Sequence, residues 1–153
     1  MSDPESTTGV LEGVFRACLD DLSRTAEFIE AFCNANHVSA EDALRLTLVV
    51  EELFTNTVVH GHGADGDSPV RIALWIADGE VGVLYEDTAP AHDPMAGWTD
   101  PPPSLASPPE SRALGGLGVY LVSRFVSDAR YAYEDGFNRL WLRVPGDEHA
   151  DRG

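Results

Sequence analysis

Two Asp-Gly pairs, Asp78-Gly79 and Asp135-Gly136, constrain the fold more than any other feature of this sequence. Each pair separates two runs in which apolar and polar residues alternate, which is the pattern of half-buried strands. Asp-Gly also suits the tight turn between neighbouring antiparallel strands. The sequence therefore predicts two β-hairpins, made of Val70–Ile76 with Val81–Tyr85 and of Ala129–Tyr133 with Phe137–Val144.

The other apolar patterns are mostly helical, with residues recurring every three or four positions. The second helix has a clear start, because Ser39 is followed three residues later by Asp42 in a capping-box arrangement. The predicted elements are a strand over Val10–Ala17 and helices over Leu19–Asn36, Ser39–His60 and Gly115–Val126. Strands paired as hairpins and helices packed on one face of their sheet give the α+β class, as a two-layer sandwich with a mainly antiparallel sheet.

The length of 153 residues fits one domain, predicted over residues 9–145. Residues 1–8 and 146–153 are predicted to be polar tails, the first of them disordered. A stretch rich in proline and serine, residues 90–109, cannot pack as regular structure and predicts a long loop that is either functional or disordered.

The net charge of −16 limits the partners, and all ten basic side chains are arginines. Nucleic acid and anionic membranes need a basic surface, so neither is expected as a partner. The sequence has no signal-peptide pattern and no run near the roughly 18 apolar residues of a membrane helix, which predicts a cytoplasmic protein. Cys18 and Cys33 lack metal-ligand spacing and are expected to be reduced and buried.

Glu52, Asn56 and His60 are four residues apart, so an α-helix would project them along one face. A hard cation such as Mg²⁺ takes oxygen ligands like the Asn56 carbonyl, and Glu52 could accept a proton from water or a hydroxyl. Taken alone, the pattern fits a solvated helix face slightly better.

Asp87 comes where the alternating strand ends. A buried carboxylate there could accept a hydrogen bond from an exocyclic amine such as that of adenine. It could equally cap its own backbone in a turn, and in isolation the turn interpretation is favoured.

Gly115, Gly116 and Gly118 precede an apolar helical pattern, where backbone N–H groups and the helix dipole favour an anion. The P-loop pattern is absent because the chain has no Gly-Lys-Ser/Thr sequence. A Rossmann site is excluded too, because no parallel βαβ unit precedes these glycines.

In this order, the three segments resemble the N, G1 and G2 boxes of the GHKL ATPase superfamily, whose ATP site is the Bergerat fold. The similarity covers about Val10–Val144 and is strongest to the anti-sigma-factor serine/threonine kinases of the RsbW and SpoIIAB type. It implies an Mg²⁺ ion on Asn56, Glu52 as catalytic base and an ATP lid over about 95–114. The resemblance implies ATP contacts from Asn56, His60, Asp87, Ala89, Arg112, Gly115, Gly116, Leu117 and Gly118.

Two positions depart from the family's G1 box, which usually reads Asp-x-Gly-x-x-Phe-Asp-Pro. Ala89 stands in place of the glycine and His92 in place of the phenylalanine. Alanine would restrict the backbone more than glycine does. The lid also carries only one basic residue, Arg112. These changes concern the adenine and phosphate ends of the pocket, whereas Glu52 is intact.

The resemblance implies a protein kinase that phosphorylates a STAS-domain anti-anti-sigma factor and otherwise sequesters a sigma factor or another regulator. The alternative is a nucleotide-responsive binding protein that sequesters its partner with little or no catalysis. A detached histidine-kinase domain is a third possibility, disfavoured because no phospho-acceptor hairpin precedes the ATP site. The apolar residues from Val10 to Val14 could support a homodimer.

Overall fold

The computed structural model describes residues 9–94 and 122–146. The predicted tails, apart from Gly146, and the predicted lid lie outside these residues. The strands are β1 (Leu11–Arg16), β2 (Pro69–Ala77), β3 (Glu80–Asp87), β4 (Asp128–Glu134) and β5 (Phe137–Val144). The helices are a 3-10 turn, η2 (Leu19–Asp21), then α1 (Leu22–Ala35), α2 (Ala40–Asn56) and a π-helical turn, η3 (Thr57–Gly61). Residues 122–125 are also helical.

The five strands form one sheet in the order β1-β2-β3-β5-β4, and every pairing among them is antiparallel. Both predicted hairpins are present. Asp78 and Gly79 have φ values of 54° and 76°, and Asp135 and Gly136 have values of 56° and 84°. Two successive residues with positive φ are what a type I′ turn requires, so the Asp-Gly pairs set the strand pairing locally.

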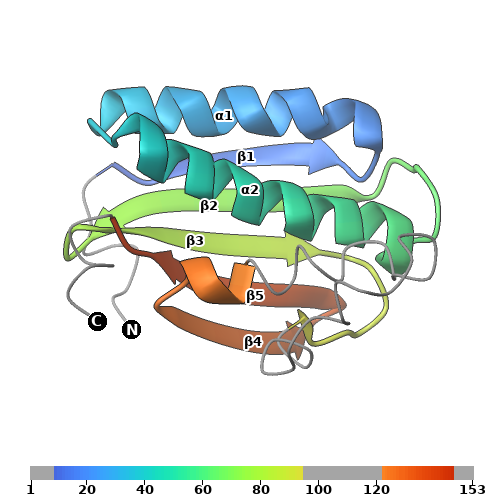
Figure 1. Cartoon of the computed structure of the whole chain (residues 1–153). Coiled ribbons are helices and arrows are strands. Elements are labelled where there is room, and N and C mark those ends of the chain that lie inside the picture. The colour runs from blue at the N-terminus through green and yellow to red at the C-terminus, as the bar shows by residue number, and fades with distance from the viewer. Residues whose placement is uncertain (1–8, 95–121, 147–153) are drawn as a thin grey trace, which may run out of the picture.

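Helices α1 and α2 cover the same face of the sheet (Figure 1). The core lies between the two layers and joins Ile29 and Phe32 of α1, Leu46 and Phe54 of α2, and apolar side chains of the sheet such as Ile72. Val122 of the last helical segment belongs to the same core. The predicted α+β two-layer sandwich is therefore confirmed. Within the described residues, no helix is both long enough and apolar enough to cross a membrane.

The second predicted helix does not stay α-helical to His60. The side chain of Ser39 caps its start by accepting from Asp42 N at 3.1 Å. The α-helical part ends at Asn56, and the chain then widens into η3, where His62 N donates to Thr57 O at 2.9 Å. Such wide turns are rare and often occur at functional sites. Asn56 and His60 are therefore not joined by α-helical backbone as expected, although His60 still acts on the charge of Glu52.

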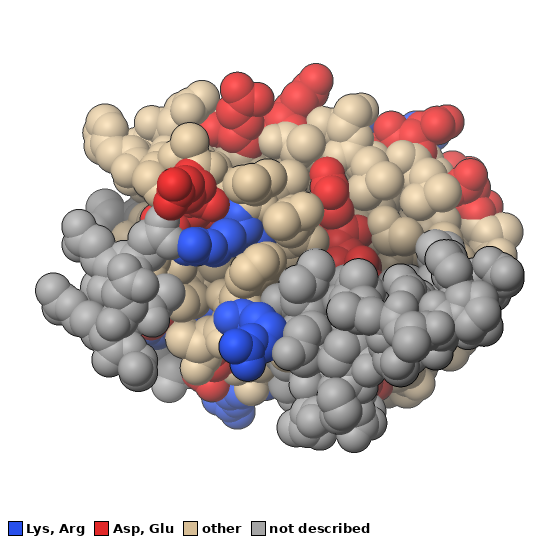
Figure 2. Space-filling view, viewed as in Figure 1, with Lys and Arg blue, Asp and Glu red and all other residues tan. Residues whose placement is uncertain are grey.

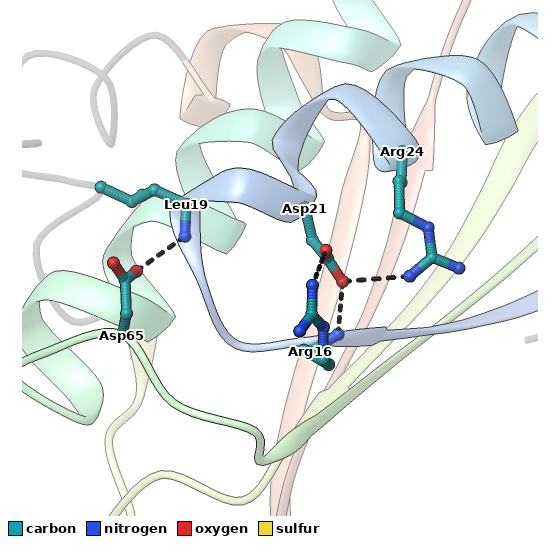
Figure 3. A network of polar contacts seen from close by, with 5 residues as sticks. All are labelled: Arg16, Leu19, Asp21, Arg24 and Asp65. Carbon is teal, nitrogen blue, oxygen red and sulfur yellow. Dashed lines mark hydrogen bonds and ion pairs between the residues drawn. The ribbon is translucent and has the colours of Figure 1, made fainter.

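The turn between β1 and α1 is organised around the buried carboxylate of Asp21 (Figure 3). Its Oδ2 accepts from Arg16 N at 2.8 Å and from Arg24 Nη1 at 3.2 Å, and its Oδ1 accepts from Arg16 Nη2 at 3.0 Å. These bonds from Arg16 keep the pKa of Asp21 below its ordinary value. Beside this turn, Leu19 N donates to Asp65 Oδ1 at 2.7 Å, which fastens the loop that follows η3.

Asp21→Asn should destabilise the fold by about 2 kcal/mol near neutral pH, because charge-assisted hydrogen bonds are lost. The pKa of Asp21 is lowered by folding, so its contribution is present above its ordinary pKa of 3.8 and is lost as the pH falls through the folded value. Urea unfolding at pH 7 and pH 3 checks both points, and the difference between variant and wild type should shrink at pH 3. Asp20→Asn is the matched control on the neighbouring exposed side chain, and an equal loss there would contradict the assignment.

Candidate functional site

Glu52 and Asn56 lie on successive turns of α2 and contact each other directly. Asn56 Nδ2 donates to Glu52 Oε1 at 3.2 Å. This contact leaves Asn56 Oδ1 buried and without a hydrogen-bond partner among the described residues. A buried carbonyl oxygen without a partner is costly, by about 1–3 kcal/mol. An amide oxygen is also the kind of ligand that Mg²⁺ accepts, so the residues present fit the metal that the sequence predicts.

The carboxyl group of Glu52 is half-buried at the same place. Burial raises its pKa above the ordinary 4.5, while the hydrogen bond from Asn56 and the nearby His60 oppose that rise. A raised pKa makes a carboxylate a better proton acceptor near neutral pH. The side chain of His60 is exposed, and its effect on Glu52 is the smallest of the three causes.

Asp87 is the last residue of β3 and is buried, with 7% of its surface exposed. Thr57 Oγ1 donates to its Oδ2 at 2.7 Å. Its Oδ1 accepts from Asn138 Nδ2 at 2.9 Å and from Ala89 N at 3.2 Å. The carboxylate thus joins η3, the start of the segment after β3, and β5. The bond from Ala89 N is the turn contact in which Asp87 caps its own backbone, the alternative that the sequence also allowed. This bond goes to Oδ1, so Oδ2 can still accept another hydrogen bond.

Tyr85 completes this buried cluster. Its hydroxyl lies 2.6 Å from Thr57 Oγ1. Burial raises the pKa of Tyr85 well above its ordinary value of 10, so the phenol keeps its proton. Because Thr57 gives its single proton best to a charged acceptor, the consistent arrangement has Tyr85 donating to Thr57 and Thr57 donating to Asp87. Every contact to Asp87 then comes from a donor.

A comparison with protein-family models decides the family. The model of the histidine kinase-like ATPase domain matches residues 15–144 of this chain, which is most of its length. The chain belongs to the histidine kinase-like ATPase family. No curated protein matches its sequence. Membership carries ATP binding with it, and the matched residues include both Glu52–Asn56 and Asp87.

In this histidine kinase-like ATPase, the alanine of the altered G1 box packs against a glycine of η3. Ala89 is buried, and it is not among the described residues with positive φ. A Cβ atom placed on Gly61 would lie 2.7 Å from the Ala89 Cβ. The methyl group of Ala89 therefore occupies space that Gly61 leaves open. The expected restriction by alanine causes no backbone strain here, because residue 89 does not need the conformation that only glycine adopts readily.

The second departure, His92, is also accommodated. Its side chain is exposed, and its backbone does the contacting. His92 N donates to Tyr131 Oη and to Asn138 Oδ1, both at 3.1 Å. The identity of this side chain therefore has little influence on how the segment after β3 is held.

Thr57, Gly61 and Asn138 were not selected from the sequence as site residues. Asn138 did carry a signal, because it opens the inward-facing series Asn138, Leu140, Leu142 and Val144 and is its one polar member. All the predicted ATP contacts stay predictions, and five of them lie outside the described residues. These five are Arg112, Gly115, Gly116, Leu117 and Gly118.

Gly61→Ala should destabilise this protein by about 1–3 kcal/mol, because the added methyl overpacks against Ala89. Elsewhere in a helix the same change is favourable by about 1 kcal/mol, so the sign is diagnostic. The double variant Gly61→Ala/Ala89→Gly should recover most of the loss. Denaturant unfolding of both singles and the double gives the coupling, and additive effects would contradict direct packing.

Proposed function

We propose that this ATPase-family protein is an Mg-ATP-dependent serine/threonine kinase that regulates a partner-switching module. The observation that supports this best is the Glu52–Asn56 pair. The amide oxygen of Asn56 is buried and has no partner in the part of the chain that the structure describes, and it lies next to a carboxyl group whose pKa is raised by burial. Transfer of a phosphoryl group to a hydroxyl needs a protein ligand for the metal ion and a group that accepts the proton of the hydroxyl.

In this proposal, residues from different parts of the chain have different roles. Asn56 Oδ1 would hold Mg²⁺, which supplies neutralisation of the phosphate charge when bound. The hydroxyl oxygen of the substrate serine or threonine would attack the γ-phosphorus of ATP, and ADP would leave. Glu52 would accept the proton of that hydroxyl. Asp87 would accept a hydrogen bond from the adenine amine at the other end. The glycine turn predicted at 115–118 would contact the phosphates between them.

The proposed substrate is a STAS-domain anti-anti-sigma factor, and the proposed sequestered partner is a sigma factor or another regulator. The charge of the protein supports a basic partner surface. Glu27 and Glu30 of α1 and Glu41 of α2 are exposed, and acidic side chains spread along the helix layer in Figure 2. Charge of this kind accelerates encounter with a basic partner and disfavours an acidic one.

A homodimer through β1 is part of the same proposal. β1 is an edge strand of the sheet. Val14 has 59% of its surface exposed, and Val10 and Leu11 each have 38%. An open edge strand with exposed apolar side chains favours pairing with another chain.

The kinase proposal is tested by mixing the protein, γ-labelled ATP, Mg²⁺ and the STAS-domain protein encoded nearest to it. Label should reach a serine or threonine of the substrate. Glu52→Ala should lower the rate at least about 100-fold, the usual contribution of a general base, while ATP binding persists. Asn56→Ala should instead weaken Mg-dependent ATP binding, measured by calorimetry. Glu51→Ala is the matched control one residue away and should behave as wild type.

A second outcome would favour the alternative. If ATP binds but no label is transferred, and Glu52→Ala leaves regulation of the partner unchanged, the protein acts by sequestration alone. The structural accommodation of Ala89 and His92 removes one reason for preferring that alternative, because neither departure distorts the segment next to Asp87.

The kinase rate should fall with decreasing pH as Glu52 becomes protonated, and the midpoint should lie above the ordinary carboxyl pKa of 4.5. His60→Gln identifies the titrating group. The nearby His60 lowers the pKa of Glu52, so removing it should move the midpoint to higher pH. If the acidic limb disappeared in this variant, His60 and not Glu52 would be the group that titrates. Initial rates from pH 5 to pH 8 provide the measurement.

A further inference from the structure

Asn138 lies at the centre of the buried polar cluster, although no motif selects it. Its Nδ2 donates to Asp87 Oδ1 at 2.9 Å, to Ala89 O at 2.9 Å and to Pro90 O at 3.2 Å. Its Oδ1 accepts from Tyr131 Oη at 2.5 Å and from His92 N at 3.1 Å. The amide therefore uses both ends, and only 9% of the residue is exposed.

The orientation of this amide is determined by its neighbours. On the nitrogen side lie a carboxylate oxygen and two backbone carbonyls, which can only accept hydrogen bonds. On the oxygen side lie a backbone N–H and a phenol, which can donate. If the amide were flipped, its oxygen would face these three acceptor oxygens, and no hydrogen bond could form there. Asn138 therefore donates to Asp87, and its neighbours keep the amide in this orientation.

The sheet register explains why Asn138 is available for this role. Residue 138 pairs directly with residue 87 across the β3–β5 ladder, so both side chains leave the sheet on the same face. The same amide also donates to the carbonyls of residues 89 and 90, the second and third residues after β3. One side chain therefore sets both the position of Asp87 and the path of the chain beside it.

The hydrogen-bond inventory of Asp87 then limits what it can recognise. A carboxylate has roughly four lone-pair sites and, when ionised, no donor. Asn138 and Ala89 N use Oδ1, and Thr57 uses one site of Oδ2. Within residues 9–94 and 122–146, no donor uses the other site on Oδ2. A base bound there would donate to it, so the site favours an amino group and disfavours a carbonyl at the same place on the base.

We infer that Asn138 is a positioning residue that sets the base selectivity of the nucleotide pocket, by holding Asp87 as an acceptor for a 6-amino group and against a 6-oxo group. This inference rests on the proposed contact between Asp87 and adenine. It assigns to β5 a part in recognising the base that the three boxes of the sequence leave out.

The test compares binding of ATP and inosine triphosphate, both with Mg²⁺, by calorimetry. The two nucleotides differ at position 6 of the base, where the amino group of adenine becomes a carbonyl, and at N1, which gains a proton. Wild type should prefer ATP. Asn138→Asp keeps the shape but removes both donors and places a second carboxyl against Asp87. Two carboxyls this close share a proton, which can be donated to the 6-oxo group, so the preference for ATP should fall at least about tenfold, the equivalent of one hydrogen bond.

Asn36→Asp is the matched control. Asn36 Nδ2 also donates to a backbone carbonyl, that of Phe32 at 2.9 Å, but at the end of α1. Its replacement should lower stability without changing the ratio of the two affinities. The control separates a general loss of stability from a change in recognition.

The outcomes are distinguishable. If wild type binds neither nucleotide, the proposed function fails. If wild type prefers ATP and Asn138→Asp weakens both nucleotides equally, Asn138 is only structural and the inference is overturned. If Asn138→Asp does not fold, Asn138→Ser introduces no charge and removes the reach to Asp87. A lowered ATP preference in that variant supports the inference, and an unchanged ratio overturns it.

Discussion

The buried carboxylate of Asp87 is the group on which the site depends. Removing a carboxylate from water costs several kcal/mol unless donors replace the lost hydration. Here the donors come from different parts of the fold, with Thr57 at the end of the helix layer and Asn138 on a neighbouring strand. The helix layer and the sheet are thereby joined at one charged point. A shift of η3 would remove the donor on Oδ2, and a shift of β5 would remove one of the two donors on Oδ1, so the cluster favours one arrangement of the layers.

The features that could be predicted from the sequence are those that depend on near neighbours. The Asp78-Gly79 and Asp135-Gly136 turns impose positive φ on two successive residues, and this determines which strands pair. Alternation within each strand then determines which side chains face the helices. The contact between Glu52 and Asn56 follows from helical spacing in the same way. These relations required no knowledge of the tertiary structure.

Contacts between distant parts of the chain could not be predicted in that way. The residues of the Gly61–Ala89 contact and of the Asn138–Asp87 bond belong to different elements, and no periodicity connects them. The π-helical turn was missed because apolar residues continue through it at nearly helical intervals, while the hydrogen bond from His62 N to Thr57 O depends on the surrounding packing. For this reason the backbone that carries His60 is π-helical and not α-helical as predicted. The predicted ATP contacts, those at Arg112 and at residues 115–118 included, all stay predictions.

The contact between Gly61 and Ala89 also bears on how such a pocket can change over generations. Only one of the two positions has room for a methyl group. A chain with glycine at both positions leaves a small gap, and a chain with alanine at both is overpacked. An ancestor with glycine at 89 could therefore acquire Ala89 without harm only while position 61 was glycine. The order of substitutions at positions 61 and 89 is therefore restricted. The effect of losing the glycine at 89 depends on which residue stands at position 61, the last residue of η3.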